Sequence, residues 1–244
     1  MSLSPPPRPS DVRAEPERDP ISSTGSGASV WLVRHGRVEV PTVAYGDDDV
    51  RLSEEGVRQT EAVARSFEGI DVATVVASPL GRARAMGEAV AGAVGAPLRV
   101  DGRWAELHRG AWQGLRRTEY AERWAEEARA YWRDTLGWRG HGGESEVQLF
   151  GRAWPALVEV VAAAGDGVGV VAAHRQVIRA VVAAAIGVPP GRSHALALDP
   201  AHAVLLRDTE AGWVLERTNV ARPGAPRRTD PEGGPPEDVV TQMR

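Results

Sequence analysis

Short apolar runs alternate along the chain with longer segments of helical periodicity, and this alternation constrains the fold more than any other feature. Apolar runs of strand length occur at residues 30–33, 74–77 and 168–173. Helical signals follow them at 53–67, 79–94 and 176–186, with Ser53 as an N-cap and Pro79 in a first turn. Strands that alternate with helices form a largely parallel sheet with helices on both faces. We therefore predict an α/β fold, a three-layer sandwich around a mostly parallel sheet.

The remaining patterns set the limits of the folded unit. Further helical segments are predicted at 116–135 and 144–164, and further strands at 203–206 and 213–215. The two ends, 1–29 and 223–244, hold 11 of the 18 prolines and no apolar periodicity, so both are predicted to be disordered tails. One domain is therefore expected over 30–222, with a helical insertion at about 116–143.

Charge and composition exclude several classes of function. The chain has 29 basic residues, all of them arginine, against 33 acidic ones, and no basic stripe that would indicate nucleic-acid binding. No apolar run approaches the roughly 20 residues of a membrane helix, so no membrane partner is expected. Cysteine is absent, which excludes disulfides and thiolate chemistry. The first residues lack the pattern of a secretory signal, so we expect a cytoplasmic protein.

Polar residues follow three of the predicted strands at the point where each strand ends. The carboxyl ends of parallel strands meet at one edge of the sheet, where ligands bind in such folds. Arginine guanidinium groups match phosphate oxygens, and a histidine facing phosphate is a plausible nucleophile. The sequence therefore predicts a phosphate site at this edge. Its candidate residues are Arg34, His35 and Gly36, then Ser78 and Arg82, and then His174 and Arg175.

These residues resemble the signature of the histidine phosphatase superfamily, also called phosphoglycerate mutase-like. The Arg34-His35-Gly36 triplet after an apolar strand carries the resemblance, which spans roughly residues 30 to 208. The other matching motifs follow in the family's order. They are Leu52-Ser53-Glu54-Glu55-Gly56 with Gln59, Ser78-Pro79-Leu80 with Arg82, Glu106 followed by Gly110 and Trp112, Gly142-Gly143-Glu144-Ser145, and His174 with Val177, Ile178 and Arg179.

The resemblance implies a role for each of five side chains. His35 would be the nucleophile that becomes phosphohistidine, and Glu106 would donate a proton to the leaving group. Arg34, Arg82 and His174 would hold the phosphoryl oxygens. No metal and no cofactor is implied, because the arginines already supply positive charge. The expected partner is a small-molecule phosphate ester, and a homodimer stays an open alternative.

The chain departs from the family pattern around this site. Arg37, Val38 and Pro41 stand where an acid or amide, a threonine and an asparagine are common, and Arg175 and Gln176 replace two frequent glycines. These changes indicate a specialised substrate. The candidates for lining its pocket are Arg37, Trp112, Trp138 and Arg175. Trp124, Trp132 and Trp154 lie within helical patterns and are expected to pack in the core.

A metal-independent phosphomonoester hydrolase is the function that these features predict. A phosphoglycerate-type mutase is one alternative, but the segment after Glu106 lacks the basic, proline-rich insertion typical of such mutases. The other alternative is a non-catalytic module that binds a phosphorylated ligand, favoured by the altered residues around the predicted site.

Overall fold

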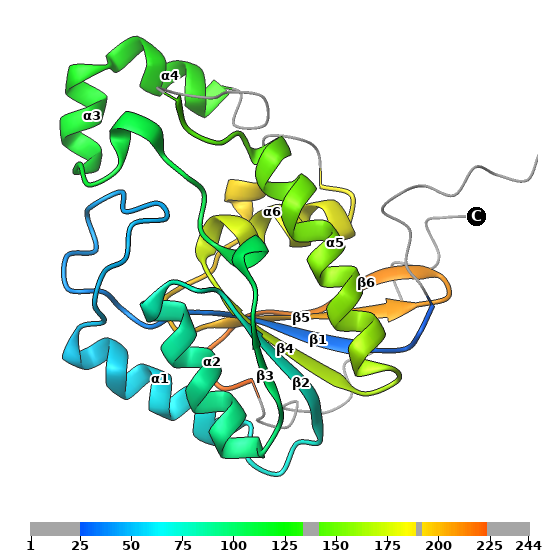
Figure 1. The fold of residues 1–244 in the computed structure, drawn as a ribbon. Helices are drawn as coiled ribbons and strands as arrows, with labels where there is room; N and C mark the ends of the chain where they lie inside the picture. Colours follow the sequence, from blue (N-terminus) through cyan, green and yellow to red (C-terminus); the bar gives the residue numbers. More distant parts are fainter. Residues whose placement is uncertain (1–24, 134–141, 189–191, 224–244) are drawn as a thin grey trace, which may run out of the picture.

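A six-stranded sheet forms the centre of the computed structural model, which describes residues 25–133, 142–188 and 192–223 (Figure 1). The strand order is β3-β2-β4-β1-β5-β6; the first four strands are parallel to one another, β5 is antiparallel to its neighbour β1, and β6 is antiparallel to β5. This confirms the predicted mostly parallel sheet. The strands are β1 (Ser29–Arg34), β2 (Val72–Ala77), β3 (Leu98–Val100), β4 (Val168–Ala173), β5 (Ala203–Thr209) and β6 (Gly212–Val220). β3 is absent from the sequence prediction because it has only three residues and lies at the sheet edge.

Two pairs of helices cover the two faces of the sheet and confirm the three layers (Figure 1). Helices α5 (Glu146–Ala164) and α6 (Arg175–Ala185) pack against one face, and α1 (Glu54–Ser66) and α2 (Gly81–Val94) against the other. Side chains of β1 alternate between these two cores. Leu32 packs with Leu157 and Ile178 on one side, whereas Val33 packs with Val63 and Met86 on the other.

Helix α5 has the length and mean hydropathy of a membrane-spanning helix, yet it is a core helix of this fold. Its buried side chains include Leu149, Leu157 and Val160, which belong to the core formed with β1, β4 and α6. The apolar character of α5 therefore follows from its place on the sheet.

The predicted helix at 116–135 is two helices, α3 (Arg117–Arg123) and α4 (Ala125–Arg133). Trp124 interrupts them with φ −133° and ψ 57°, outside the helical region. The two helices have their own small core, in which Trp112 stacks on Tyr120 with ring centroids 4.5 Å apart. The predicted insertion therefore folds over one end of the sheet as a separate layer; its residues 134–141 lie outside the described part of the chain.

The folded unit begins a few residues earlier than the sequence predicts. The Ser26 hydroxyl donates to Asp208 Oδ2 at 2.9 Å, and Ala28 is fully buried. The prediction of a disordered tail as far as residue 29 is therefore wrong for residues 26–29, which pair with the β5 region. Residues 1–24 and 224–244 lie outside the described part of the chain.

Two glycines bring the start of α1 against the loop that follows β1. A Cβ on Gly36 would overlap the carbonyl oxygen of Gly56, and a Cβ on Gly56 would overlap the carbonyl oxygen of Arg37. The same Arg37 carbonyl accepts hydrogen bonds from the Ser53 backbone N–H and hydroxyl at 2.9 and 3.1 Å. Helix α1 thus fixes the backbone on both sides of Gly36.

We predict that Gly56→Ala destabilises the protein by about 1–3 kcal/mol, because backbone atoms must move to admit the methyl group. For a domain of this size that corresponds to a melting temperature lower by roughly 2–12 °C. Gly92→Ala is the matched control, since it lies in α2 with open space around its Cα. Alanine there should stabilise the helix by about 0.5–1 kcal/mol. Equal melting temperatures for the two variants would contradict the close approach at Gly56.

Candidate active site

The register of the parallel strands brings two histidines together. Arg34 at the end of β1 pairs with Ala173 at the end of β4, so His35 and His174 are the next residues at the same edge. Their ring centroids lie 5.1 Å apart. Strand β2 is in register on the other side of β4, and it delivers Ser78 beside His174.

His35 is held in one tautomer by its own backbone. Its Nδ1 lies 2.7 Å from the carbonyl oxygen of Gly36. A carbonyl only accepts, so Nδ1 carries the proton and Nε2 keeps its lone pair. The side chain is 7% exposed, and burial, followed by the charges of Arg82 and Arg34, lowers the pKa of His35 to about 3. His35 is therefore a neutral imidazole with a free Nε2.

Arg34 and Arg82 are anchored by backbone carbonyl groups. Arg34 donates through Nη1 to Leu198 O at 2.7 Å, while its Nε is buried without a protein partner. Arg82, at 4% exposure, donates to Gly46 O and Asp48 O, both at 2.7 Å. Burial and the nearby Arg175 lower the pKa of Arg34 to about 10, so its guanidinium stays charged at neutral pH. Carbonyl anchors fix the geometry of these cations without neutralising them.

His174 is fully buried and is oriented by Ser78. Its Nε2 lies 2.8 Å from Ser78 Oγ, and that oxygen also accepts from the Leu80 backbone N–H at 3.3 Å. The Ser78 proton can then be donated to Nε2, which leaves the proton of His174 on Nδ1. This Nδ1 is buried without a protein partner, as is Arg34 Nε. Buried polar atoms are nearly always hydrogen-bonded, so these two donors point to a ligand with acceptor oxygens.

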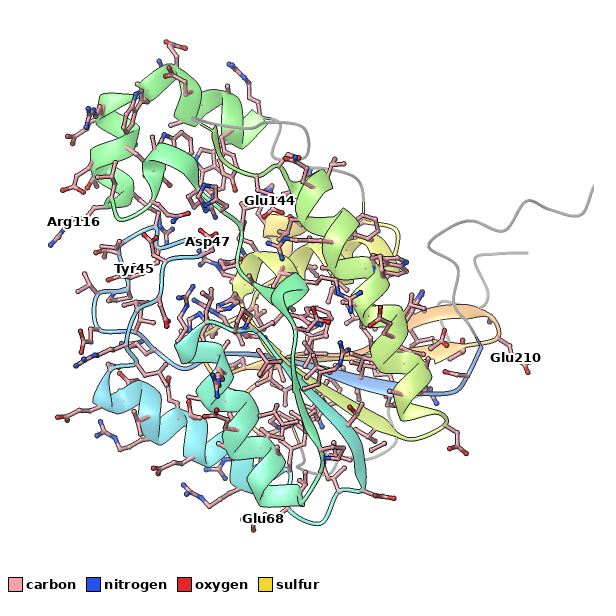
Figure 2. The ribbon with its side chains drawn as sticks, in the orientation of Figure 1. Tyr45, Asp47, Glu68, Arg116, Glu144 and Glu210 are labelled. Carbon is pink, nitrogen blue, oxygen red and sulfur yellow. The ribbon has the colours of Figure 1, made fainter. Side chains whose placement is uncertain are left out.

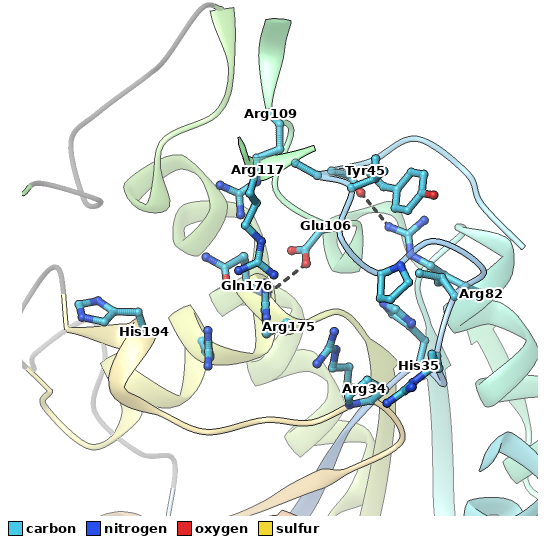
Figure 3. Close-up of a pocket in the computed structure, with 18 of the residues that line it drawn as sticks. Arg34, His35, Tyr45, Arg82, Glu106, Arg109, Arg117, Arg175, Gln176 and His194 are labelled. Atoms are coloured by element: carbon cyan, nitrogen blue, oxygen red, sulfur yellow. Dashed lines mark hydrogen bonds between the residues drawn. The ribbon is translucent and has the colours of Figure 1, made fainter. Parts of the chain in front are cut away.

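Glu106 is bound at the start of α6. Its Oε1 accepts from the Leu107 N–H at 2.9 Å and its Oε2 accepts from the Gln176 N–H at 3.2 Å. Figure 3 shows this carboxylate between Arg82 on one side and Arg175 on the other. Glu106 therefore faces the same space as the phosphate-site candidates.

Arg34, His35, Arg82 and Glu106 line one pocket of about 300 Å³, at the lower end of the range for small-molecule sites. One wall is the strand edge, and the opposite wall comes from the loop after β1 and from the α3–α4 segment. Figure 2 shows Tyr45 and Asp47 on that loop, between α1 and the α3–α4 segment. The residues that line the pocket beyond the predicted set include Tyr45, Arg109, Arg117, Tyr120, Tyr131, Trp132, Glu146, Gln176, Arg179 and His194.

The structure brings Arg34, His35, Arg82, Glu106, Arg175 and Arg37 into this pocket. His174 is fully buried beside His35, with the two rings tilted by 58°. Arg37 lies at the rim, where its half-exposed side chain pairs with Glu55 at 3.4 Å. Arg109, Arg117 and Tyr131 also line the pocket but are absent from the predicted set. In the sequence Arg109 is visible only as a departure from the family pattern after Glu106, and the other two belong to no motif.

Two of the tryptophan predictions are wrong. Trp112 is 1% exposed and lies in the small core beneath α3 and α4 instead of lining the pocket. Trp132, predicted to be in the core, is 54% exposed and lines the pocket. Trp112 lies in the short 3-10 helix Gly110–Trp112 and stacks on Tyr120 of α3, which buries it. The prediction for Trp132 assumes one continuous helix, whereas α4 is a separate helix that begins after Trp124. Trp154 is buried as predicted, Trp124 packs on the small core, and Trp138 lies outside the described residues.

Comparisons with known proteins agree with this geometry. The model of the histidine phosphatase superfamily (branch 1) matches residues 30–221. The chain belongs to this superfamily. It is 35% identical over 167 residues to glucosyl-3-phosphoglycerate phosphatase of Mycolicibacterium vanbaalenii, which covers 65% of this chain and 74% of that one. The predicted family, fold and phosphatase class are thus confirmed.

A solved structure extends the similarity to the whole domain. The vanadate complex of a mycobacterial glucosyl-3-phosphoglycerate phosphatase superposes with a TM-score of 0.72 at 31% identity, over 79% of this chain and 99% of that one. A probable phosphoglycerate mutase of Erwinia tasmaniensis is less similar, with 25% identity over 77% of this chain and 90% of the mutase. The phosphatase alternative is therefore better supported than the mutase.

Metal independence stays a prediction for this chain. Within residues 25–133, 142–188 and 192–223, no group of three or more His, Asp or Glu side chains is placed to hold a metal ion. His108 instead pairs with Asp47 at 2.7 Å, and His202 Nδ1 lies 2.9 Å from Pro200 O.

The low pKa of His35 predicts how stability depends on pH. An unfolded histidine takes up a proton near pH 6.5, whereas folded His35 resists protonation until about pH 3. Stability should therefore fall as the pH is lowered from about 6.5 towards 3, and this residue contributes no pH dependence above that window. In His35→Ala, urea unfolding followed between pH 7 and 4 should show a slope smaller by about one proton. An unchanged slope would contradict the burial of a neutral His35.

Proposed function

We propose that this chain hydrolyses the phosphate monoester of a small metabolite through a phosphohistidine on His35. The observation that carries the proposal is the tautomer of His35, whose protonated Nδ1 leaves Nε2 free beside two buried, unpartnered donors, Arg34 Nε and His174 Nδ1. A nucleophile needs a lone pair, and phosphoryl oxygens need donors. His35 Nε2 would supply the lone pair, and Arg34 Nε and His174 Nδ1 would supply the donors, at the same end of the pocket.

The reaction takes place in two steps. In the first, the Nε2 lone pair attacks phosphorus and the ester P–O bond breaks, while Glu106 in its acid form donates a proton to the departing oxygen. In the second, water attacks the phosphohistidine and gives its proton to Glu106, so that inorganic phosphate leaves and Nε2 recovers its electron pair. One carboxyl group thus acts first as acid and then as base.

Positive charge around the phosphorus provides the remaining catalysis. Phosphoryl transfer depends chiefly on positioning and on stabilising charge over the equatorial oxygens. Arg34 and Arg82 carry that charge from fixed positions, since carbonyl groups of Leu198, Gly46 and Asp48 anchor them. The same charges lower the pKa of His35 and so keep its imidazole neutral. The two arginines therefore favour the nucleophilic form of His35 and also stabilise the charge of the transition state.

The similarity to phosphatases also indicates the class of substrate. The two phosphatases named above are glucosyl-3-phosphoglycerate phosphatases, so their substrate is that phosphate ester. We infer that this chain acts on a phosphorylated metabolite of comparable size, and that compound belongs in the first substrate panel. A cytoplasmic location and a homodimer remain predictions.

We predict that His35→Ala abolishes phosphate release, because no other described side chain presents an imidazole nitrogen to the same oxygen-binding donors. Rapid quench of the wild type with a ³²P-labelled ester, in EDTA, should trap an acid-labile, base-stable label on His35. His108→Ala is the matched control, since its ring pairs with Asp47 outside the pocket, and it should retain the label. Label in the His35→Ala protein would refute the assignment, and loss of turnover in EDTA would refute metal independence.

A second prediction concerns the proton donor. General acid catalysis contributes about 10²–10⁴-fold, and it matters most for a basic leaving group. Glu106→Gln should therefore slow phosphohistidine formation by that factor for an alkyl phosphate and much less for p-nitrophenyl phosphate. Glu68→Gln, exposed at the end of α1, serves as the control (Figure 2). Equal losses for both leaving groups in single-turnover measurements would show that Glu106 positions substrate instead.

A further inference from the structure

The pocket contains far more positive charge than one phosphate requires. Among the described residues, seven arginines line it, and only two carboxylates, Glu106 and Glu146, face the same space. Arg34 and Arg82 serve the reacting phosphate in the proposed function. The other arginines of the lining are Arg37, Arg109, Arg117, Arg175 and Arg179.

Two of these five have structural partners. Arg37 pairs with Glu55 at 3.4 Å, and Arg179 donates through Nε to Leu196 O at 2.6 Å. Arg152, outside the pocket, shows what a structural arginine looks like in this protein. It bonds both oxygens of Glu144 and the carbonyls of Arg103, Ala105 and Glu106.

Arg109, Arg117 and Arg175 differ from this pattern. Among the described residues, no ion pair joins any of the three to a carboxylate. They come from separate places in the chain, since Arg117 begins α3, Arg175 begins α6 and Arg109 lies just before a short 3-10 helix. Figure 3 shows them together on the side of Glu106 away from His35 and Arg82. The fold therefore assembles three cations on one side of Glu106, of which Arg175 is also near Arg34.

One of the three is positioned by the α3–α4 segment. Arg109 donates through Nη1 to the Tyr131 hydroxyl at 3.0 Å, with its guanidinium carbon 5.5 Å from the centre of that ring. A tyrosine hydroxyl orients the guanidinium without cancelling its charge.

Like charges close to one another repel, and this repulsion contributes to the lowered pKa of Arg175. Burial lowers the pKa of Arg175; Glu106 opposes that effect, while Arg117 and Arg109 add to it. Grouping three cations therefore disfavours the empty pocket, and an anion bound among them would remove the repulsion.

We propose that Arg109, Arg117 and Arg175 form a second anion subsite, which selects phosphate esters that carry another anionic group, a carboxylate or a second phosphate, remote from the reacting phosphate. This inference rests on the proposed function, because the first phosphate is placed at His35. Planar guanidinium groups bind either anion through paired hydrogen bonds. Glu106 lies beside these cations, but the proposed function uses it as the proton donor, so a substrate with only one phosphate adds no counter-charge to them.

Matched pairs of esters test the subsite. Glycerol 3-phosphate and 3-phosphoglycerate differ by a carboxylate, whereas fructose 6-phosphate and fructose 1,6-bisphosphate differ by a phosphate. The wild type should favour the more acidic member of at least one pair by tenfold or more in kcat/KM, and the pair that responds identifies the anion. Equal kcat/KM within both pairs would overturn the proposal.

Substitutions then assign the preference to these side chains. Arg109→Gln, Arg117→Gln and Arg175→Gln should each reduce the preference by about tenfold, chiefly through KM, and Arg117→Lys should recover part of it. Arg58→Gln is the control, because that arginine is exposed on α1 and pairs with Glu54 away from the pocket. Arg117 is itself exposed, so its variant should fold normally. A preference that survives in all three variants would overturn the proposal.

A binding measurement separates this inference from the proposed function. His35→Ala should bind 3-phosphoglycerate or fructose 1,6-bisphosphate at least tenfold more tightly than its less acidic partner in calorimetry, and Arg175→Gln in that background should remove the difference. If the wild type releases no phosphate from any ester, the proposed hydrolysis is wrong, and the calorimetry still decides the subsite. Equal affinities within both pairs would refute the subsite even if hydrolysis is observed.

Discussion

The parallel pairing of β1 with β4 is the constraint on which the rest of the site depends. The register that joins Arg34 to Ala173 makes His35 and His174 neighbours, and β2 on the other side of β4 adds Ser78. Three segments distant in sequence thus meet through backbone hydrogen bonds alone. A shift of one residue in this register would turn each of these side chains to the opposite face of the sheet.

Once the histidines are together, their neutrality depends on what surrounds them. Burial removes the solvent that would stabilise an imidazolium, and Arg34 and Arg82 oppose it further, so both histidines have lowered pKa values. The arginines stay charged because backbone carbonyl groups solvate them in place of water. At the sheet edge the arginines therefore carry the positive charge, whereas His35 stays neutral and keeps the lone pair of its Nε2.

The sequence predicted correctly those parts of the structure that have a regular apolar period or a recognisable motif. The strands at β1, β2 and β4, the N-cap at Ser53 and the residues that follow the strands all occur where the pattern indicates, because local hydrogen bonding and burial determine them. The errors lie where tertiary packing decides. Trp112 is buried by its stack on Tyr120, Trp132 lies on a separate helix that begins after Trp124, and the contacts of Ser26 with Asp208 depend on a strand 182 residues away.

The same distinction explains why chemistry and selectivity come from different parts of the chain. The sheet edge is rigid and carries the reacting groups, whereas α3 and α4 have a small core of their own, in which the stack of Trp112 on Tyr120 is independent of the central sheet. Residues on this layer can therefore change without altering the register of β1 and β4. Arg109 and Tyr131 belong to this layer and Arg175 to the first turn of α6. The pocket lies between the two layers, so residues of its outer wall can differ to suit another ester while the residues proposed for phosphoryl transfer stay in place.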